Sequence, residues 1–223
     1  NPEFFRNLAN AVSSCSQLCG MTLLHGAVRY NSPQHVITKM IQICPDMLAA
    51  KDFLGRTPLH VAAGSKASAS LLRLLANACP AACNVQDEDG KTPLHFLCDT
   101  SCVLFEEDHH DKCDVRSNPP PNHEAVLTLL SFSIHAATIE DDEEMSPLEH
   151  AIMSNSSLET VKLLQFATSR GMQLSRLQSF IAATTSLQPQ EVDDFISSIT
   201  YNDRPVKRTR RVTAYQEDSN SIV

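Results

Sequence analysis

Three histidines, His25, His60 and His95, recur at equal steps of 35 residues along the 223-residue chain. Histidine serves as a metal ligand and as an acid or base near neutral pH, so this repetition raises the question of a metal or catalytic site. Such a site needs its groups to converge, whereas one histidine per repeat distributes them along an axis. We therefore expect a structural role for all three histidines.

A second set of potential metal ligands is close together in the sequence: His109, His110, Asp111, Cys113 and His123. Their residue types suit zinc or copper. The surrounding segment is acidic, rich in proline and poor in apolar residues that could hold four ligands in tetrahedral geometry. A solvated loop is the favoured interpretation, with a partner-binding loop and a metal site as the alternatives.

Carboxylates are also concentrated, because residues 140–144 are five consecutive acids. Paired carboxylates can act in acid–base catalysis, but these follow one another on a predicted turn, which implies a solvated or partner-facing patch. No Ser/His/Asp, Cys/His or glycine-rich phosphate pattern occurs in a supporting context. We predict that the protein is not an enzyme, with no catalytic residue, cofactor, metal or small-molecule substrate.

The composition favours helices that pack closely through small residues. Aromatic residues make up 5% of the chain, there is no tryptophan, and there are only six glycines. No run of about 18 apolar residues could span a membrane, and no secretory signal is visible, so we expect an intracellular protein, cytoplasmic, nuclear or both. The eight cysteines should then be reduced thiols.

A four-residue motif marks a repeat: TLLH at 22–25, TPLH at 57–60 and 92–95, and SPLE at 146–149. Thr57 suits a helix N-cap and Pro58 the first helical position. A second apolar helical pattern, LLRLL at 71–75, follows, and a turn with Gly90 precedes the next motif. Each such unit buries too little surface alone, so neighbouring units must stack.

These motifs resemble the ankyrin repeat family, which carries T-P-L-H-x-A, a V-x-x-L-L helix and a D-x-x-G turn. The resemblance covers roughly residues 4–170 and implies an all-α, ankyrin-like helical solenoid with short β-turn or hairpin tips. It also implies that the motif histidine hydrogen-bonds to backbone and to the motif threonine. Glu149 replaces that histidine in the fourth unit, next to His150.

The predicted organisation has four parts. Residues 1–20 form an N-terminal half-repeat or cap, and residues 175–201 form C-terminal capping helices. Residues 202–223 form a disordered basic tail. Between these lie the repeats, at approximately 21–55, 56–90, 91–144 with an inserted loop at 103–122, and 145–174.

The resemblance implies a protein-interaction module or scaffold that binds a partner on its concave face. That face consists of the turn tips and exposed positions of each first helix, which we expect near the helix start. Phe53 and Leu54 stand out as an apolar pair at a solvated tip, which indicates either a binding anchor or a contact with a neighbouring repeat. The predicted partner-binding residues are Arg29, Tyr30, Phe53, Leu54, Arg56, Gly64, Ser65, Glu88, Asp89, Lys91, Asp99, Thr100, Glu143, Glu144, Met145, Met153 and Ser154.

Charge is distributed unevenly: residues 203–223 carry a net +2, whereas the rest of the chain carries −10. We expect a basic protein partner and a salt-sensitive association. The tail residues Arg204, Lys207, Arg208, Arg210 and Arg211 resemble a nuclear-import signal, with plain solvating charge or contact with RNA or anionic membrane as alternatives. A second hypothesis is therefore a nuclear regulatory protein whose tail directs import or contacts nucleic acid.

Neutralising Lys207, Arg208, Arg210 and Arg211 together tests the import hypothesis. A fluorescent fusion of the variant should shift to the cytoplasm relative to the unchanged chain. An unchanged distribution would refute a role for the tail in import.

Overall fold

The computed structural model describes residues 3, 20–101, 104 and 122–185. The chain divides into two compact units, Asn1–Arg176 and Leu177–Val223, and the helical stack belongs to the first. All regular elements of the described residues are helices and short 3₁₀ turns. The all-α prediction is therefore confirmed.

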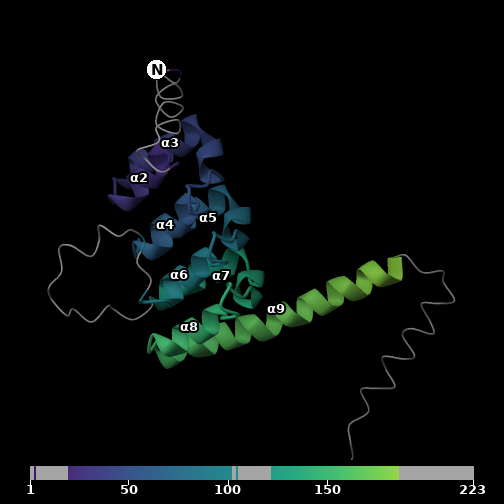
Figure 1. Cartoon of the computed structure of the whole chain (residues 1–223). Helices are drawn as coiled ribbons and strands as arrows, with labels where there is room; N and C mark the ends of the chain where they lie inside the picture. Colours follow the sequence, from purple (N-terminus) through teal and green to yellow (C-terminus); the bar gives the residue numbers. More distant parts are fainter. Residues whose placement is uncertain (1–2, 4–19, 102–103, 105–121, 186–223) are drawn as a thin grey trace, which may run out of the picture. The chain divides into compact units, whose positions relative to one another are not determined.

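The first unit contains two layers of helices (Figure 1). The first layer consists of α2 (Leu23–Arg29), α4 (Pro58–Gly64), α6 (Pro93–Cys98) and α8 (Pro147–Met153), and each packs on the next. The second layer consists of α3 (Gln34–Ile43), α5 (Ala69–Ala78) and α7 (His123–Phe132) in the same order. The helix α9 (Leu158–Thr185) follows α8. Three 3₁₀ turns, Pro45–Leu48, Pro80–Asn84 and His135–Thr138, follow the second-layer helices.

Local sequence signals set the helix ends. Thr57 is the N-cap of α4, and Pro58 occupies its first position, where a missing N–H costs little. Cys44 and Cys79 end α3 and α5 with extended φ values of −136° and −145°. A proline follows each cysteine, and its ring disfavours helical backbone at the preceding residue.

The core lies between the two layers and consists mainly of leucine and alanine. Leu24, Leu59 and Leu94 occupy the same position in three successive first-layer helices, and each is at most 2% exposed. Ala62 and Ala63 are fully buried on α4, and their small side chains allow neighbouring helices to approach closely. The aromatic-poor composition is thus matched by tight helix packing.

The helix α9 runs for 28 residues, across residues 174 and 175, where the fourth repeat and the capping helices are predicted to meet. The division between the two compact units lies close to that position, between Arg176 and Leu177. Within the first unit, α9 contacts the preceding repeat through Thr168, whose hydroxyl donates to the carbonyl of Ala137 at 3.2 Å. The N-terminal half-repeat, apart from Glu3 and Gly20, and residues 186–201 lie outside the described residues.

The turn before α8 departs from the earlier turns. Gly20, Gly55 and Gly90 have φ of about +72°, and the equivalent residue of the last turn is Glu144, with φ of +60°. A residue with a β-carbon pays roughly 1–2 kcal/mol for left-handed backbone. From the sequence, Glu144 is expected only as an exposed acid, and this backbone strain is not predicted.

Replacing Glu144 by glycine should raise the free energy of unfolding by about 0.5–1 kcal/mol. Relief of the left-handed backbone exceeds the entropy that glycine loses on folding, about 0.5–1 kcal/mol. Thermal unfolding measures the gain. Glu143→Gly is the matched control, because its φ is not positive, and this variant should lose stability; equal effects of the two changes would contradict the strain.

Candidate functional site

The turn before each of the last three first-layer helices is built around one aspartate. Asp52 Oδ1 accepts from the backbone N–H groups of Leu54 and Arg56 at 3.0 and 2.9 Å. Asp87 and Asp141 make the same two bonds in the next two turns. The backbone N–H of each aspartate also donates to the carbonyl of the residue four positions later, at 2.9–3.0 Å. Each turn is thereby a closed, rigid loop.

Successive turns are joined by backbone hydrogen bonds. The N–H of Glu88 donates to the carbonyl of Leu54 at 3.0 Å, and the N–H of Asp142 donates to that of Asp89 at 3.1 Å. Gln86 adds a side-chain link, since its Nε2 donates to the carbonyl of Glu140 at 3.0 Å. The turns therefore project in a fixed row, although the described residues contain no β-strand.

The three motif histidines are fully buried and connect each repeat to the next. In His60, Nδ1 accepts from the backbone N–H of Thr57 at 3.0 Å and lies 2.9 Å from its hydroxyl. Because Nδ1 accepts, the ring proton is on Nε2, which donates to the carbonyl of Lys91 at 3.2 Å. His25 and His95 make the same contacts with Thr22 and Thr92 and with the carbonyls of Arg56 and Met145.

Burial keeps these imidazoles neutral. Loss of solvation lowers the pKa of His60 to about 3 and that of His95 to about 4, and it also lowers the pKa of His25. Their hydrogen bonds to carbonyls act in the opposite direction but are outweighed. The structural role predicted for the histidines, with bonds to backbone and threonine, is confirmed.

A model of the family "Ankyrin repeats (many copies)" matches residues 45–97. This range contains the turns 52–56 and 87–91 and the helices α4 and α5. Residues 45–97 are ankyrin repeats. Among curated proteins, no sequence matches the chain. Outside the matched region, α2 and α8 have the same kind of capping box, and the turn before α8 repeats the aspartate bonds.

The positions predicted on the first-layer helices lie at their C-terminal ends and not near their starts. Arg29 and Gly64 are the last residues of α2 and α4, and Asp99 directly follows α6. They share a surface with the turns, because Lys91 Nζ of one turn lies 3.3 Å from Asp99 Oδ2. We call the surface formed by the turns and these helix ends the tip face.

Many of the predicted partner-binding residues are exposed on the tip face. Tyr30, Phe53 and Met153 are the most exposed apolar residues there, at 76%, 55% and 73%. Ser65 and four acids, Glu88, Asp89, Glu143 and Glu144, are also exposed. Arg29, Leu54, Gly64, Lys91, Thr100, Met145 and Ser154 are partly buried.

Two predicted surface residues are buried. Arg56 is 3% exposed, because its guanidinium pairs with Asp52 through Nε and Nη2, each 2.9 Å from Oδ2. Asp99 is 8% exposed and accepts from the backbone N–H and hydroxyl of Ser101 at 2.8 and 2.6 Å. Burial raises the pKa of Asp99, but the bonds from Ser101 and Lys91 outweigh it and give a net lowering. A charged residue at a predicted tip position can thus be either buried or exposed, and its residue type and sequence position do not show which.

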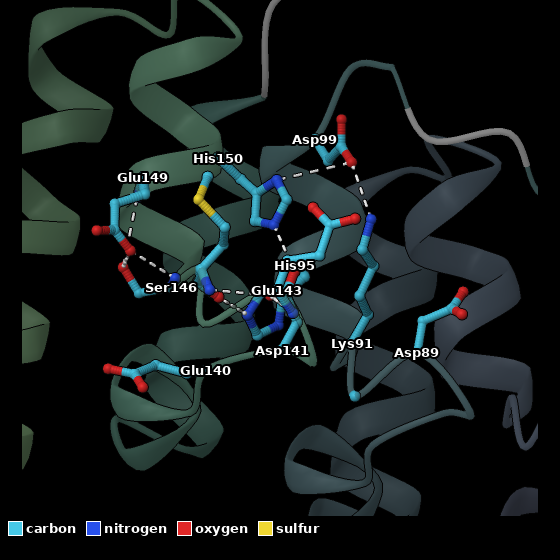
Figure 2. Close-up of polar contacts among 12 residues, drawn as sticks. Asp89, Lys91, His95, Asp99, Glu140, Asp141, Glu143, Ser146, Glu149 and His150 are labelled. Carbon is cyan, nitrogen blue, oxygen red and sulfur yellow. Dashed lines mark hydrogen bonds and ion pairs between the residues drawn. The ribbon is translucent and has the colours of Figure 1, made fainter.

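Between α6 and α8 lies a polar network that was not predicted from the sequence (Figure 2). His150 Nε2 lies 2.7 Å from Asp141 Oδ2, and its Nδ1 lies 3.7 Å from Asp99 Oδ2. The ring of His150 also contacts His95 edge-on, at 5.6 Å between centroids. Glu149 instead caps its own helix, accepting from the N–H and hydroxyl of Ser146 at 2.7 Å each. The register of His150, one position beyond the motif histidine, is the signal that could have indicated its inward direction.

The chemistry predicted from the other sequence features falls mainly outside the described residues. His109, His110, Asp111, Cys113 and the basic tail are not described, so the metal and import hypotheses remain predictions. His123 is described, and its Nδ1 lies 3.3 Å from the hydroxyl of Thr160. Within residues 20–101 and 122–185, no three His, Cys, Asp or Glu side chains gather as a metal site would require. No helix of the described part is long and apolar enough to cross a membrane.

The buried histidines predict an acid-sensitive fold. In the unfolded chain their imidazoles bind protons near pH 6.5, whereas folding lowers the pKa of His60 and His95 to about 3 and 4. Stability should therefore be complete above pH 6.5 and fall as the pH approaches 4, by up to about 1.4 kcal/mol per pH unit for each histidine.

Urea unfolding between pH 7.5 and pH 4.5 measures this loss. His60→Gln should lower stability at pH 7.5 and reduce the steepness of the acid loss. Leu59→Ala is the control, because it creates a cavity of similar cost but removes no titrating group. An acid dependence that is equally steep in both variants would contradict neutral buried imidazoles.

Proposed function

We propose that the chain binds a protein partner through its tip face. The observation that carries this proposal is the display of exposed aromatic and acidic side chains on turns held in register by backbone hydrogen bonds. Ankyrin repeats are typically protein-interaction modules, which supports the same reading. Rigid presentation matters because a partner then binds without the entropy cost of ordering the surface.

Phe53 is the proposed anchor of this surface. Its side chain is 55% exposed at the tip of the turn 52–56. Hydrogen bonds to the Asp52 carboxylate fix the backbone next to it, so the main chain that carries the exposed ring is rigid. Aromatic side chains that are rigidly displayed in this way contribute much of the energy of protein interfaces.

Acidic groups give the surface its charge preference. Glu88, Asp89, Glu143 and Glu144 are exposed on consecutive turns. Figure 2 shows Asp89 and Glu140 extending away from the pair His95 and His150. We infer that the partner presents a basic surface around an apolar contact, because opposite charge accelerates association and favours the correct orientation.

Affinity purification with mass spectrometry tests the proposal. Phe53→Asp should abolish capture of the specific partner while the thermal midpoint changes by no more than about 2 °C, since a half-exposed side chain contributes little to folding. Phe166→Asp is the matched control: Phe166 is 67% exposed on α9 and is not one of the tip-face residues, so its loss should leave capture intact.

The same assay, repeated across salt concentrations, tests the charge preference. Capture should weaken as ionic strength rises, because salt screens exposed charges beyond about 8 Å at 0.15 M. If Phe53→Asp lowers the midpoint by several degrees, Phe53 is a structural contact. If it leaves both stability and capture unchanged, the tip face is not the binding surface.

A further inference from the structure

Leu104 lies in the chain between α6 and α7 but is packed on the second repeat. Its side chain is only 7% exposed and joins the apolar core. Two residues distant in sequence hold it there: Gly64 at the end of α4 and Arg56 at the end of the turn 52–56. Both belong to the tip face.

Gly64 makes room for the leucine side chain. A β-carbon at Gly64 would lie 2.6 Å from Leu104 Cγ and 2.8 Å from its Cδ1. Such separations do not occur between real carbon atoms, so with any larger residue here the leucine side chain or its surroundings must shift. Gly64 is not among the glycines with positive φ, so its backbone conformation does not require glycine. The equivalent positions of the neighbouring repeats carry long or charged side chains, Arg29, Asp99 and Met153.

Arg56 fixes the leucine backbone. Its Nε and Nη2 are engaged by Asp52, and its Nη1 donates to the carbonyl oxygen of Leu104. The guanidinium is thus held rigidly by one partner and presents its remaining edge to the other. The space beside Gly64, which the leucine side chain fills, and the oriented donor Arg56 Nη1 together form a two-point site for one residue of an extended chain.

We propose that Leu104 is an internal occupant of a leucine subsite on the tip face, and that the partner enters this subsite only by displacing it. This inference rests on the proposed function, because Gly64 and Arg56 belong to the surface assigned above to partner binding. The partner segment that fits has an aliphatic side chain of leucine size and a carbonyl oxygen free of intrahelical bonds. An extended or loop segment meets this requirement, whereas the interior of a helix does not, since its carbonyls are already paired.

The stability of the docked Leu104 determines how strongly it competes with a partner for the subsite. Burial of one leucine side chain favours the docked state by about 10- to 100-fold. Because Leu104 belongs to the same chain, it competes at an effective concentration in the millimolar range or above. A partner that offers only a leucine is excluded, and one that also engages other tip-face residues can displace Leu104.

Chymotrypsin digestion of the full chain reports whether Leu104 is docked, because the protease must take up a free leucine side chain to cut the Leu104–Phe105 bond. Gly64→Ala should accelerate that cleavage at least tenfold, since the added β-carbon expels the leucine. Alanine also favours helix over glycine, so the rest of α4 stays folded. Ser65→Ala, next to it and exposed, is the matched control and should cut at the original rate. Equal cleavage rates for the unchanged chain and Gly64→Ala would overturn the docked leucine.

A second measurement tests displacement. The probe is a synthetic pentapeptide with the sequence of residues 102–106 and serine in place of its cysteine, observed by saturation-transfer NMR at its leucine methyl groups. The signal should be at least threefold larger with Leu104→Ser than with the unchanged chain, and it should disappear in Leu104→Ser combined with Gly64→Ala. Equal signals from the unchanged chain and Leu104→Ser would overturn competition for the subsite.

These outcomes are separable from those of the proposed function. Protease cleavage and peptide binding report on Leu104 whether or not a protein partner uses the tip face. Loss of the Phe53 effect in affinity purification would remove partner binding without changing either measurement. Conversely, if the protease and peptide tests both overturn the docking of Leu104, the proposed role of Phe53 is unaffected.

Discussion

The stacking of this protein depends on a neutral imidazole that is shared between two repeats. Each motif histidine accepts from the N-cap threonine of its own helix and donates to a carbonyl of the following turn. That carbonyl belongs to the residue that also closes the aspartate loop, as Lys91 does for Asp87. One buried ring thus positions a helix start and the next turn together. Protonation would remove the acceptor and place a charge in the core, which explains why burial and neutrality must occur together.

The bonding pattern changes at α8, because Glu149 takes the position of the motif histidine. At the start of α8, Glu149 caps the helix from the surface, and among the described residues no histidine links α8 to a following turn. His150 points back instead, between Asp141 and Asp99. The left-handed backbone at Glu144 lies in the same repeat. The unit of α8 therefore packs on the preceding unit through a polar network. In the earlier units, the motif histidine makes the same bond to the next turn each time.

The tip face combines rigidity with unequal accessibility. Aspartate loops and backbone bonds between turns fix the positions of Phe53 and the exposed acids. In the same row, Arg56 is buried by Asp52 and covered by Leu104. Residues at equivalent repeat positions thus play opposite roles, since Lys91 remains partly exposed and pairs with Asp99. The surface that a partner meets is determined by which equivalent position is already engaged within the chain.

The sequence alone determined the repeated motif and its helix starts, and the resemblance of that motif to ankyrin repeats implied the role of its histidines. The helix starts follow from local rules, because threonine caps and proline at the first helical position act within a few residues. Tertiary structure decided what local rules cannot reach. The burial of Arg56 and Asp99, the direction of His150 and the docking of Leu104 on Gly64 all depend on contacts between distant segments. A residue at a turn tip has the same local sequence signal whether its side chain faces solvent or a neighbouring segment, so only the packed chain distinguishes the two.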